Sequence, residues 1–117
     1  LPQRVFRPRP WESDDKPGDT DGLSISRAWI SSVEVASTCP FTSRQLSLAS
    51  VAAATVTNLE LSIEPKPTAH DVGHALIPEL NSISGRDSDY QLWIDEQAIA
   101  LRNAATVVLE TLPKSTG

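Results

Sequence analysis

The most regular pattern of apolar positions lies near the end of the chain. Five apolar residues follow one another at intervals of four and three: Ile94, Ala98, Leu101, Ala105 and Val108. This spacing places their side chains along one stripe of a helix. Ser88 and Gln91 form a capping-box pair before the stripe, and Pro113 follows it. We therefore predict a long helix over 89–111 that buries its apolar stripe in the core.

Three earlier segments have the apolar content or alternation of strands. Residues 23–29 alternate apolar and polar side chains after Gly22, and residues 59–64 show the most regular alternation before Pro65. Alternation with a period of two is typical of a strand that buries one face. The short apolar run 74–77 predicts a further strand.

A short helix is predicted between the first two strands. Ser31 and Glu34 have the spacing of a capping box, in which each side chain accepts from a free backbone amide of the other. The helix is expected over 32–37 and stops before Cys39-Pro40, because the residue that precedes a proline avoids the helical region.

Residues 43–58 allow two interpretations. They could form one continuous helix, or a short strand over 46–48 followed by a helix over 51–57. We prefer the second, in which Ser50 caps the helix and Asn58 takes the left-handed conformation that ends it.

The resulting fold class is α+β, with a small mixed sheet packed against the long C-terminal helix. If 43–58 is a single helix, the alternative is a compact all-helical domain. We expect an extended, proline-rich N-terminal arm over 1–22, a single α+β domain over 23–112 and a frayed tail over 113–117. Trp29 and Trp93 lie beside apolar neighbours and are predicted to belong to the core.

Composition narrows the class of protein. The chain has 117 residues and a net charge of −5, but three arginines give the first ten residues +3, which leaves −8 for the remainder. An acidic body disfavours general nucleic-acid binding. The single cysteine, Cys39, excludes an intramolecular disulfide and a multi-cysteine zinc site. No apolar run is long enough to span a membrane, so we expect a soluble, cytoplasmic protein.

The N-terminal arm carries the first candidate site. Its partner-binding candidates interleave cationic and aromatic side chains: Arg4, Phe6, Arg7, Arg9 and Trp11. On a stiff proline backbone they could dock into a groove of a partner protein, or meet phosphates and stack on unpaired bases. Alternatively, the arm folds back, with Phe6 and Trp11 as core contacts and the acidic run from Glu12 pairing with its arginines.

The second candidate site holds the two histidines of the chain. His70, Asp71 and His74 are weak candidates for catalysis, since a carboxylate can orient an imidazole. The alternative is a loop histidine beside a half-buried one that is hydrogen-bonded to the backbone. Two histidines four residues apart bind one metal when they share a helix face, but Gly73 and the nearby prolines argue against a helix here.

Acidic residues before the first predicted strand suggest calcium. An EF-hand loop would need a carboxylate where Pro17 stands and a glutamate where Ala28 stands, so an EF-hand is excluded. A looser cation site would use Asp19 and Asp21, with help from other nearby aspartates. We favour an acidic turn, and predict neither a metal nor a cofactor, since no glycine-rich phosphate loop or nucleophile motif is present.

Two short motifs, Asp21-Gly22-Leu23-Ser24 and Gly73-His74-Ala75, resemble segments of small bacterial proteins, and this resemblance carries no function. Our leading interpretation is a non-enzymatic protein-interaction module, of the kind used in toxin–antitoxin, immunity or accessory systems. One alternative is a small toxin-like transferase or nuclease that uses the His70–His74 loop with Arg27 or Arg86. The other is a nucleic-acid-binding accessory protein that uses the arm.

Overall fold

The computed structural model describes residues 3–38 and 46–109. Cys39-Pro40 and the tail over 113–117 lie outside these described residues. The elements, in chain order, are η1 (Gln3–Phe6), β1 (Leu23–Ser26), α1 (Val33–Ala36), β2 (Leu48–Ser50), α2 (Ala53–Asn58), β3 (Glu64–Pro65), β4 (His74–Ile77), η2 (Ser84–Arg86), α3 (Ser88–Ala104) and β5 (Thr106–Leu109).

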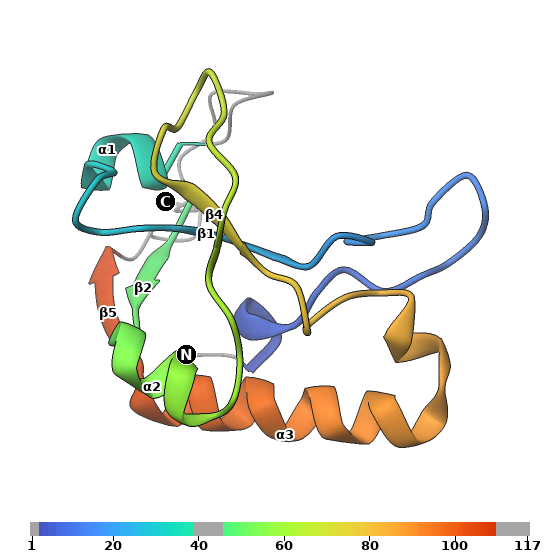
Figure 1. The fold of residues 1–117 in the computed structure, drawn as a ribbon. Coiled ribbons are helices and arrows are strands. Elements are labelled where there is room, and N and C mark those ends of the chain that lie inside the picture. Colours follow the sequence, from blue (N-terminus) through green and yellow to red (C-terminus); the bar gives the residue numbers. More distant parts are fainter. Residues whose placement is uncertain (1–2, 39–45, 110–117) are drawn as a thin grey trace, which may run out of the picture.

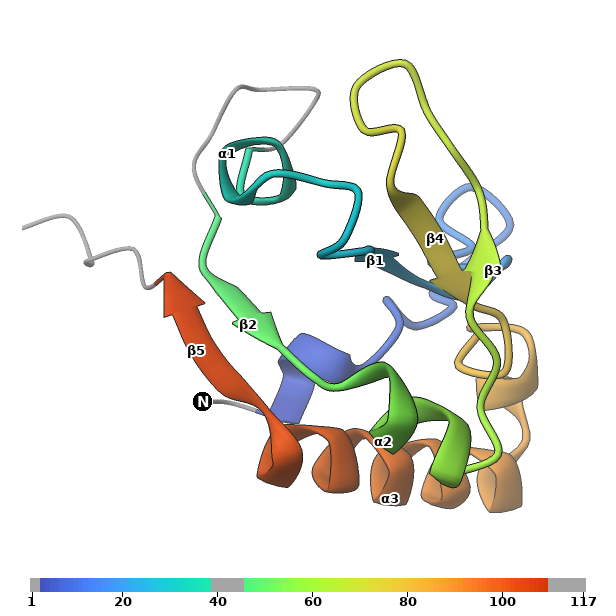
Figure 2. The ribbon, with the colours of Figure 1, turned by 60° about the vertical axis from the view of Figure 1, so that its left-hand side comes forward.

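The fold is α+β, as predicted, and the all-helical alternative is wrong. β4 lies between β1 and β3 in an antiparallel three-stranded sheet, and β2 and β5 form a separate antiparallel pair. α3 runs along one side of the molecule, with η1 and α2 against it and the three-stranded sheet across the core from it (Figures 1 and 2). Within the described residues, no helix is long and apolar enough to cross a membrane.

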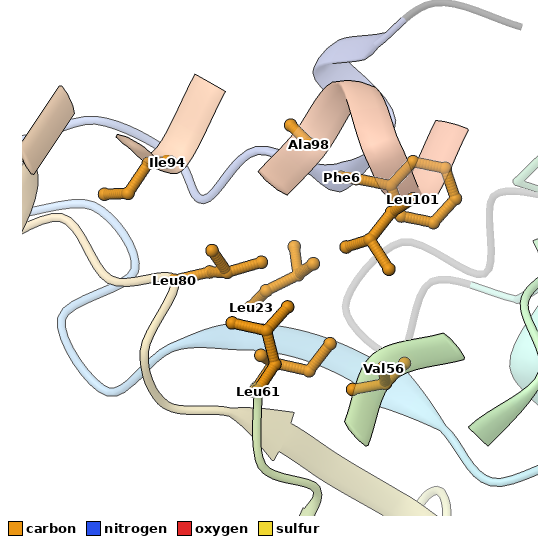
Figure 3. Packing of buried hydrophobic residues seen from close by; sticks show 9 residues of the cluster. Phe6, Leu23, Val56, Leu61, Leu80, Ile94, Ala98 and Leu101 are labelled. Carbon is orange, nitrogen blue, oxygen red and sulfur yellow. The ribbon is translucent and has the colours of Figure 1, made fainter. Parts of the chain in front are cut away.

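The core lies between α3 and the sheet. The first three residues of the predicted stripe are buried: Ile94, Ala98 and Leu101. They face apolar side chains from β1, α2 and the loops after α2 and β4, and Phe6 of the arm joins the same cluster beside α3 (Figure 3). Complete burial of each large apolar side chain contributes about 1.5–3 kcal/mol. Phe6 therefore anchors the beginning of the arm in the core.

The predicted extent of the last helix is wrong at both ends. Asp87, not Ser88, is the N-cap, since its carboxylate accepts from the amides of Asp89 and Tyr90. At the other end α3 stops at Ala104, and the residues that continue the stripe enter β5 and pair with β2. The run Thr106–Val108 is β-branched, which suits a strand once a partner strand is available.

The prediction of a strand over 59–64 is also largely wrong. Only Glu64 and Pro65 form β3, whereas the backbone before them closes the end of α2, with the Leu61 amide donating to Val56. Glu60 takes a positive φ of 62° in this turn, a role predicted for Asn58, which stays helical. The alternation of apolar and polar residues over 59–64 reflects which side chains are buried and not the pairing of strands. Leu61 is buried, while its neighbours in the chain are exposed.

The preferred interpretation of 46–58, a strand followed by a helix, is confirmed, but both elements begin about two residues later than predicted. The strand is β2 (Leu48–Ser50) and the helix is α2 (Ala53–Asn58). Ser50 belongs to the strand, and Ala52 takes the N-cap position without a side-chain hydrogen bond. Residues 39–45 lie outside the described residues.

β1 and α1 are each shorter than predicted. β1 ends at Ser26, and the next residues turn, so Trp29 is 67% exposed instead of lying in the core. Trp93, in contrast, packs against the core. α1 is capped by Ser32 rather than by a Ser31–Glu34 box, because the Ser31 hydroxyl donates to a buried carboxylate described below.

Candidate functional site

A pocket of about 360 Å³ lies between the N-terminal arm and the first turns of α3. One wall is the arm from Arg7 to Trp11, and the other comes from the segment after β4 and from α3. The described lining includes three arginines and no carboxylate, together with uncharged polar and apolar side chains: Arg7, Pro8, Arg9, Pro10, Trp11, Asn81, Ser82, Arg86, Gln91 and Ile94. The pocket thus combines cationic, aromatic and apolar surfaces.

Arg7 joins the arm to α3. Its Nη2 lies 2.9 Å from Oδ1 of Asp95. The same carboxylate oxygen accepts a hydrogen bond from the side-chain amide of Gln91, whose Nε2 lies 3.0 Å away. The neighbouring Nε of Arg7 is buried and has no hydrogen-bond partner among the described residues. One lining arginine is therefore held in place while it keeps an unsatisfied donor.

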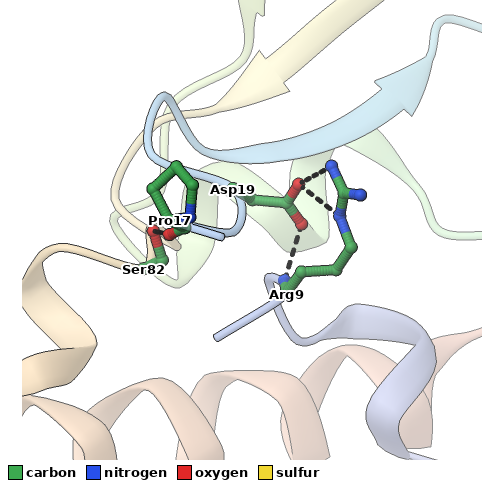
Figure 4. Close-up of polar contacts among 4 residues, drawn as sticks. All are labelled: Arg9, Pro17, Asp19 and Ser82. Atoms are coloured by element: carbon green, nitrogen blue, oxygen red, sulfur yellow. Dashed lines mark hydrogen bonds and ion pairs between the residues drawn. The ribbon is translucent and has the colours of Figure 1, made fainter. Parts of the chain in front are cut away.

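Arg9 is fastened to the acidic turn. Its Nε and Nη2 both lie 2.9 Å from Oδ1 of Asp19, and its backbone amide donates to Oδ2 at 2.6 Å (Figure 4). Ser82 holds the other side of this turn through a 2.6 Å bond from its hydroxyl to the Pro17 carbonyl oxygen. Gly18, between them, has a φ of +74°, and a Cβ there would overlap the Arg9 carbonyl oxygen. The turn therefore sets the position of the arm.

Trp11 and Arg86 both line the pocket and contact each other. The guanidinium carbon of Arg86 lies over the indole ring, 4.5 Å from its centroid, which is a cation–π contact. Arg86 has no acidic partner among the described residues. Asp87, its neighbour in the chain, directs its carboxylate to the amides of α3 instead.

The candidate arm residues therefore have different environments. Arg7, Arg9 and Trp11 meet in the pocket, whereas Phe6 is only 9% exposed and lies in the core. Arg4 belongs to η1, and its side chain lies outside the described part of the structure.

Asp71 is the centre of a polar cluster that joins three segments. It is 5% exposed, and its carboxylate accepts from the hydroxyls of Ser26 at 2.6 Å and Ser31 at 2.5 Å and from the Gly73 amide at 2.9 Å. Arg27 adds bonds from its side chain to the carbonyl oxygens of Val72 and Gly73. The cluster holds the loop before β4 against the end of β1.

The electrostatics of this cluster favour a charged carboxylate. Burial raises the pKa of Asp71, but the hydrogen bonds from Ser26, Ser31 and Gly73 and the charge of His74 together outweigh it. The pKa of Asp71 consequently lies below its ordinary value.

The two histidines contact different backbone segments. Nε2 of His70 donates to the carbonyl oxygens of Val35 at 3.3 Å and Thr38 at 3.1 Å, whereas Nδ1 of His74 donates to Lys66 at 2.8 Å. These bonds connect the His70 ring to the end of α1 and the His74 ring to the residue that follows β3. Asp71 is engaged by hydroxyls and an amide, and no hydrogen bond to either imidazole is present among these described residues.

In the acidic turn, the carboxylate of Asp19 is bonded within the protein. Both oxygens of Asp19 are bonded to Arg9, while Asp21 is exposed. In the described ranges, no group of three or more His, Cys, Asp or Glu side chains is arranged to hold a metal ion.

Sequence reasoning missed the second wall of the pocket. Asn81 and Ser82 belong to no motif, and the pattern around Gln91 and Arg86 indicates other roles, a helix cap and a partner for the histidines. One usable signal is present in the sequence, since the acidic run from Glu12 offers pairing partners for the arginines of the arm, and Asp19 fulfils that role. Comparison of the chain with models of protein families, with curated proteins and with solved structures found no match.

Proposed function

We propose that this protein is a small interaction module that binds a peptide segment of a partner protein in the pocket between the arm and α3. The observation that carries the proposal is the mixed chemistry of the pocket. Arg7, Arg9 and Arg86 lie in one concavity with Trp11 and Ile94, so charged and apolar groups of a ligand can be bound together. A volume of about 360 Å³ accommodates a few side chains.

The fixed geometry of the pocket supports this proposal. Arg7 is bound to Asp95 on α3, and Arg9 is bound to Asp19 in the acidic turn. The ligand would therefore meet a wall that is already ordered, and binding loses less conformational entropy when the site is ordered beforehand.

The contacts of the His70–His74 loop favour the pocket as the functional site. Asp71 and both imidazoles are bonded to hydroxyls or backbone groups that connect loops and strands. This use of their polar atoms supports an architectural role for the loop.

Selection of peptides displayed on phage tests the proposal. The intact protein should enrich peptides that no longer bind the Trp11→Ala variant, because the indole forms part of the pocket wall. Trp29→Ala is the matched control, since Trp29 is 67% exposed and outside the described lining. Circular dichroism would verify that both variants fold.

Two outcomes would contradict the proposal. One is that the intact protein enriches no peptide. The other is that the enriched peptides bind the folded Trp11→Ala variant as tightly as the wild type. A deletion of the whole arm would be a poor test, because it also removes Phe6 from the core.

A further inference from the structure

We infer that the pocket anchors its ligand by one carboxylate, the side chain of an aspartate or glutamate in the bound segment, held by Arg86 and by the Nε–H of Arg7. This inference rests on the proposed function and specifies the ligand of the same site.

Among the described residues around the pocket, one cation has no counter-charge. Arg7 lies 2.9 Å from Asp95 and Arg9 lies 2.9 Å from Asp19. Arg86, the third arginine of the described lining, is paired with no acid in the described part of the chain. A carboxylate carries one negative charge and would neutralise the positive charge of Arg86. A phosphate group carries about 1.5–2 negative charges, which is more than this one cation can neutralise.

The contact with Trp11 holds Arg86 for a planar anion. The indole covers one face of the guanidinium group, whose N–H donors lie along the edge of the guanidinium plane. A carboxylate matches this edge with two parallel hydrogen bonds. Because the indole holds the group, less side-chain freedom is lost when the anion binds.

Arg7 offers the second donor. Its Nη2 is held by Asp95, while the buried Nε–H finds no acceptor among the described residues. A buried donor without a partner destabilises the free protein, and a shift of the Arg7 side chain toward the pocket would let an acceptor oxygen of the ligand satisfy it. The same residue lines the pocket, so both observations concern one site.

Titration of the 15N-labelled protein with capped dipeptides tests the inference. The probes are acetyl-Glu-Leu-amide, acetyl-Gln-Leu-amide and acetyl-phosphoserine-Leu-amide, and the readout is the indole N–H signal of Trp11. We expect the Glu probe to bind about tenfold more tightly than the Gln probe, a difference that corresponds to about 1.4 kcal/mol. Arg86→Gln should abolish this preference, and Arg86→Lys should weaken it because the planar edge is lost.

Arg102→Gln is the matched control, because Arg102 lies near the end of α3 and outside the described lining, and it should keep the preference. Equal binding of the Glu and Gln probes, tighter binding of the phosphoserine probe, or no shift of the Trp11 signal would each overturn the inference. These failures are distinct from failure of the proposed function. Peptides that depend on Trp11 but carry no acidic residue would preserve the module and refute only the carboxylate anchor.

Discussion

Replacing Asp71 by alanine should destabilise the fold by about 3 kcal/mol, although the residue lies in a loop. The carboxylate is the shared acceptor for Ser26, Ser31 and the Gly73 amide. Its removal disconnects β1, the segment before α1 and the loop before β4 in one step.

The size of this destabilisation depends on whether each hydrogen-bond donor can find water once the carboxylate is removed. The Gly73 amide is buried, and a stranded buried donor costs about 1–3 kcal/mol. The hydroxyls of Ser26 and Ser31 are half-buried, so water can replace part of what they lose, at about 0.5–1 kcal/mol each. These contributions give about 2–5 kcal/mol, which for a domain of this size lowers the melting temperature by about 10 °C.

Thermal and urea unfolding followed by circular dichroism would measure the change. Asp14→Ala is the control, since Asp14 is exposed and should alter the free energy of unfolding by less than about 0.5 kcal/mol. If Asp71→Ala and Asp14→Ala unfold at the same urea concentration, the assigned role of the cluster is wrong.

The same carboxylate gives a pH dependence with a defined sign. Because the folded-state pKa of Asp71 lies below its unfolded value of about 3.9, its charge stabilises the fold fully above that value. This contribution is lost as the pH falls through the folded-state pKa. The stability gap between the wild type and Asp71→Asn should therefore narrow below pH about 3.9. A gap of constant size down to pH about 2 would contradict the direction of the shift.

Four further substitutions test individual contacts. Gly73→Ala should destabilise the protein by about 1–3 kcal/mol in urea unfolding, because its Cβ would overlap a Ser31 hydroxyl already bonded to Asp71; unchanged stability would contradict this packing. Leu80→Ala should cost about 2–5 kcal/mol in the same assay, since the side chain is completely buried, and a cost below 1 kcal/mol would place it outside the core. Asp19→Ala should destabilise the protein more than Arg9→Gln does. The Arg9 side chain is 81% exposed, so its ion pair contributes little, whereas Asp19 also accepts a hydrogen bond from the backbone amide of Arg9. If Asp19→Ala and Arg9→Gln lower the free energy of unfolding equally, the Arg9–Asp19 contact is only a surface ion pair.

The fold was predictable where local periodicity decides the structure. Ile94, Ala98 and Leu101 follow the helical period and are buried as expected. Val108 fits the same stripe, yet it also suits a strand, and the choice depends on the pairing of β5 with β2, which lies far away in the sequence. No local pattern contains that information.

The candidate site was predictable only on one side. The arginines and Trp11 of the arm were recognised as a group, but the opposite wall comes from Asn81, Arg86 and Gln91, which only tertiary packing brings near. The density of ionisable groups around Asp71 suggested chemistry. Its actual partners, the hydroxyls of Ser26 and Ser31, are 45 and 40 residues away in the chain.

The position of Phe6 also constrains how the chain reaches its native state. η1 is the first described element, yet its aromatic ring shares the core with Leu101 near the end of the last helix (Figure 3). During synthesis Phe6 leaves the ribosome long before α3 does, so the core cannot close until α3 has been made. Such contacts between distant parts of a sequence slow folding, because a long loop must close before they form. The folding of this core is thereby tied to the synthesis of α3.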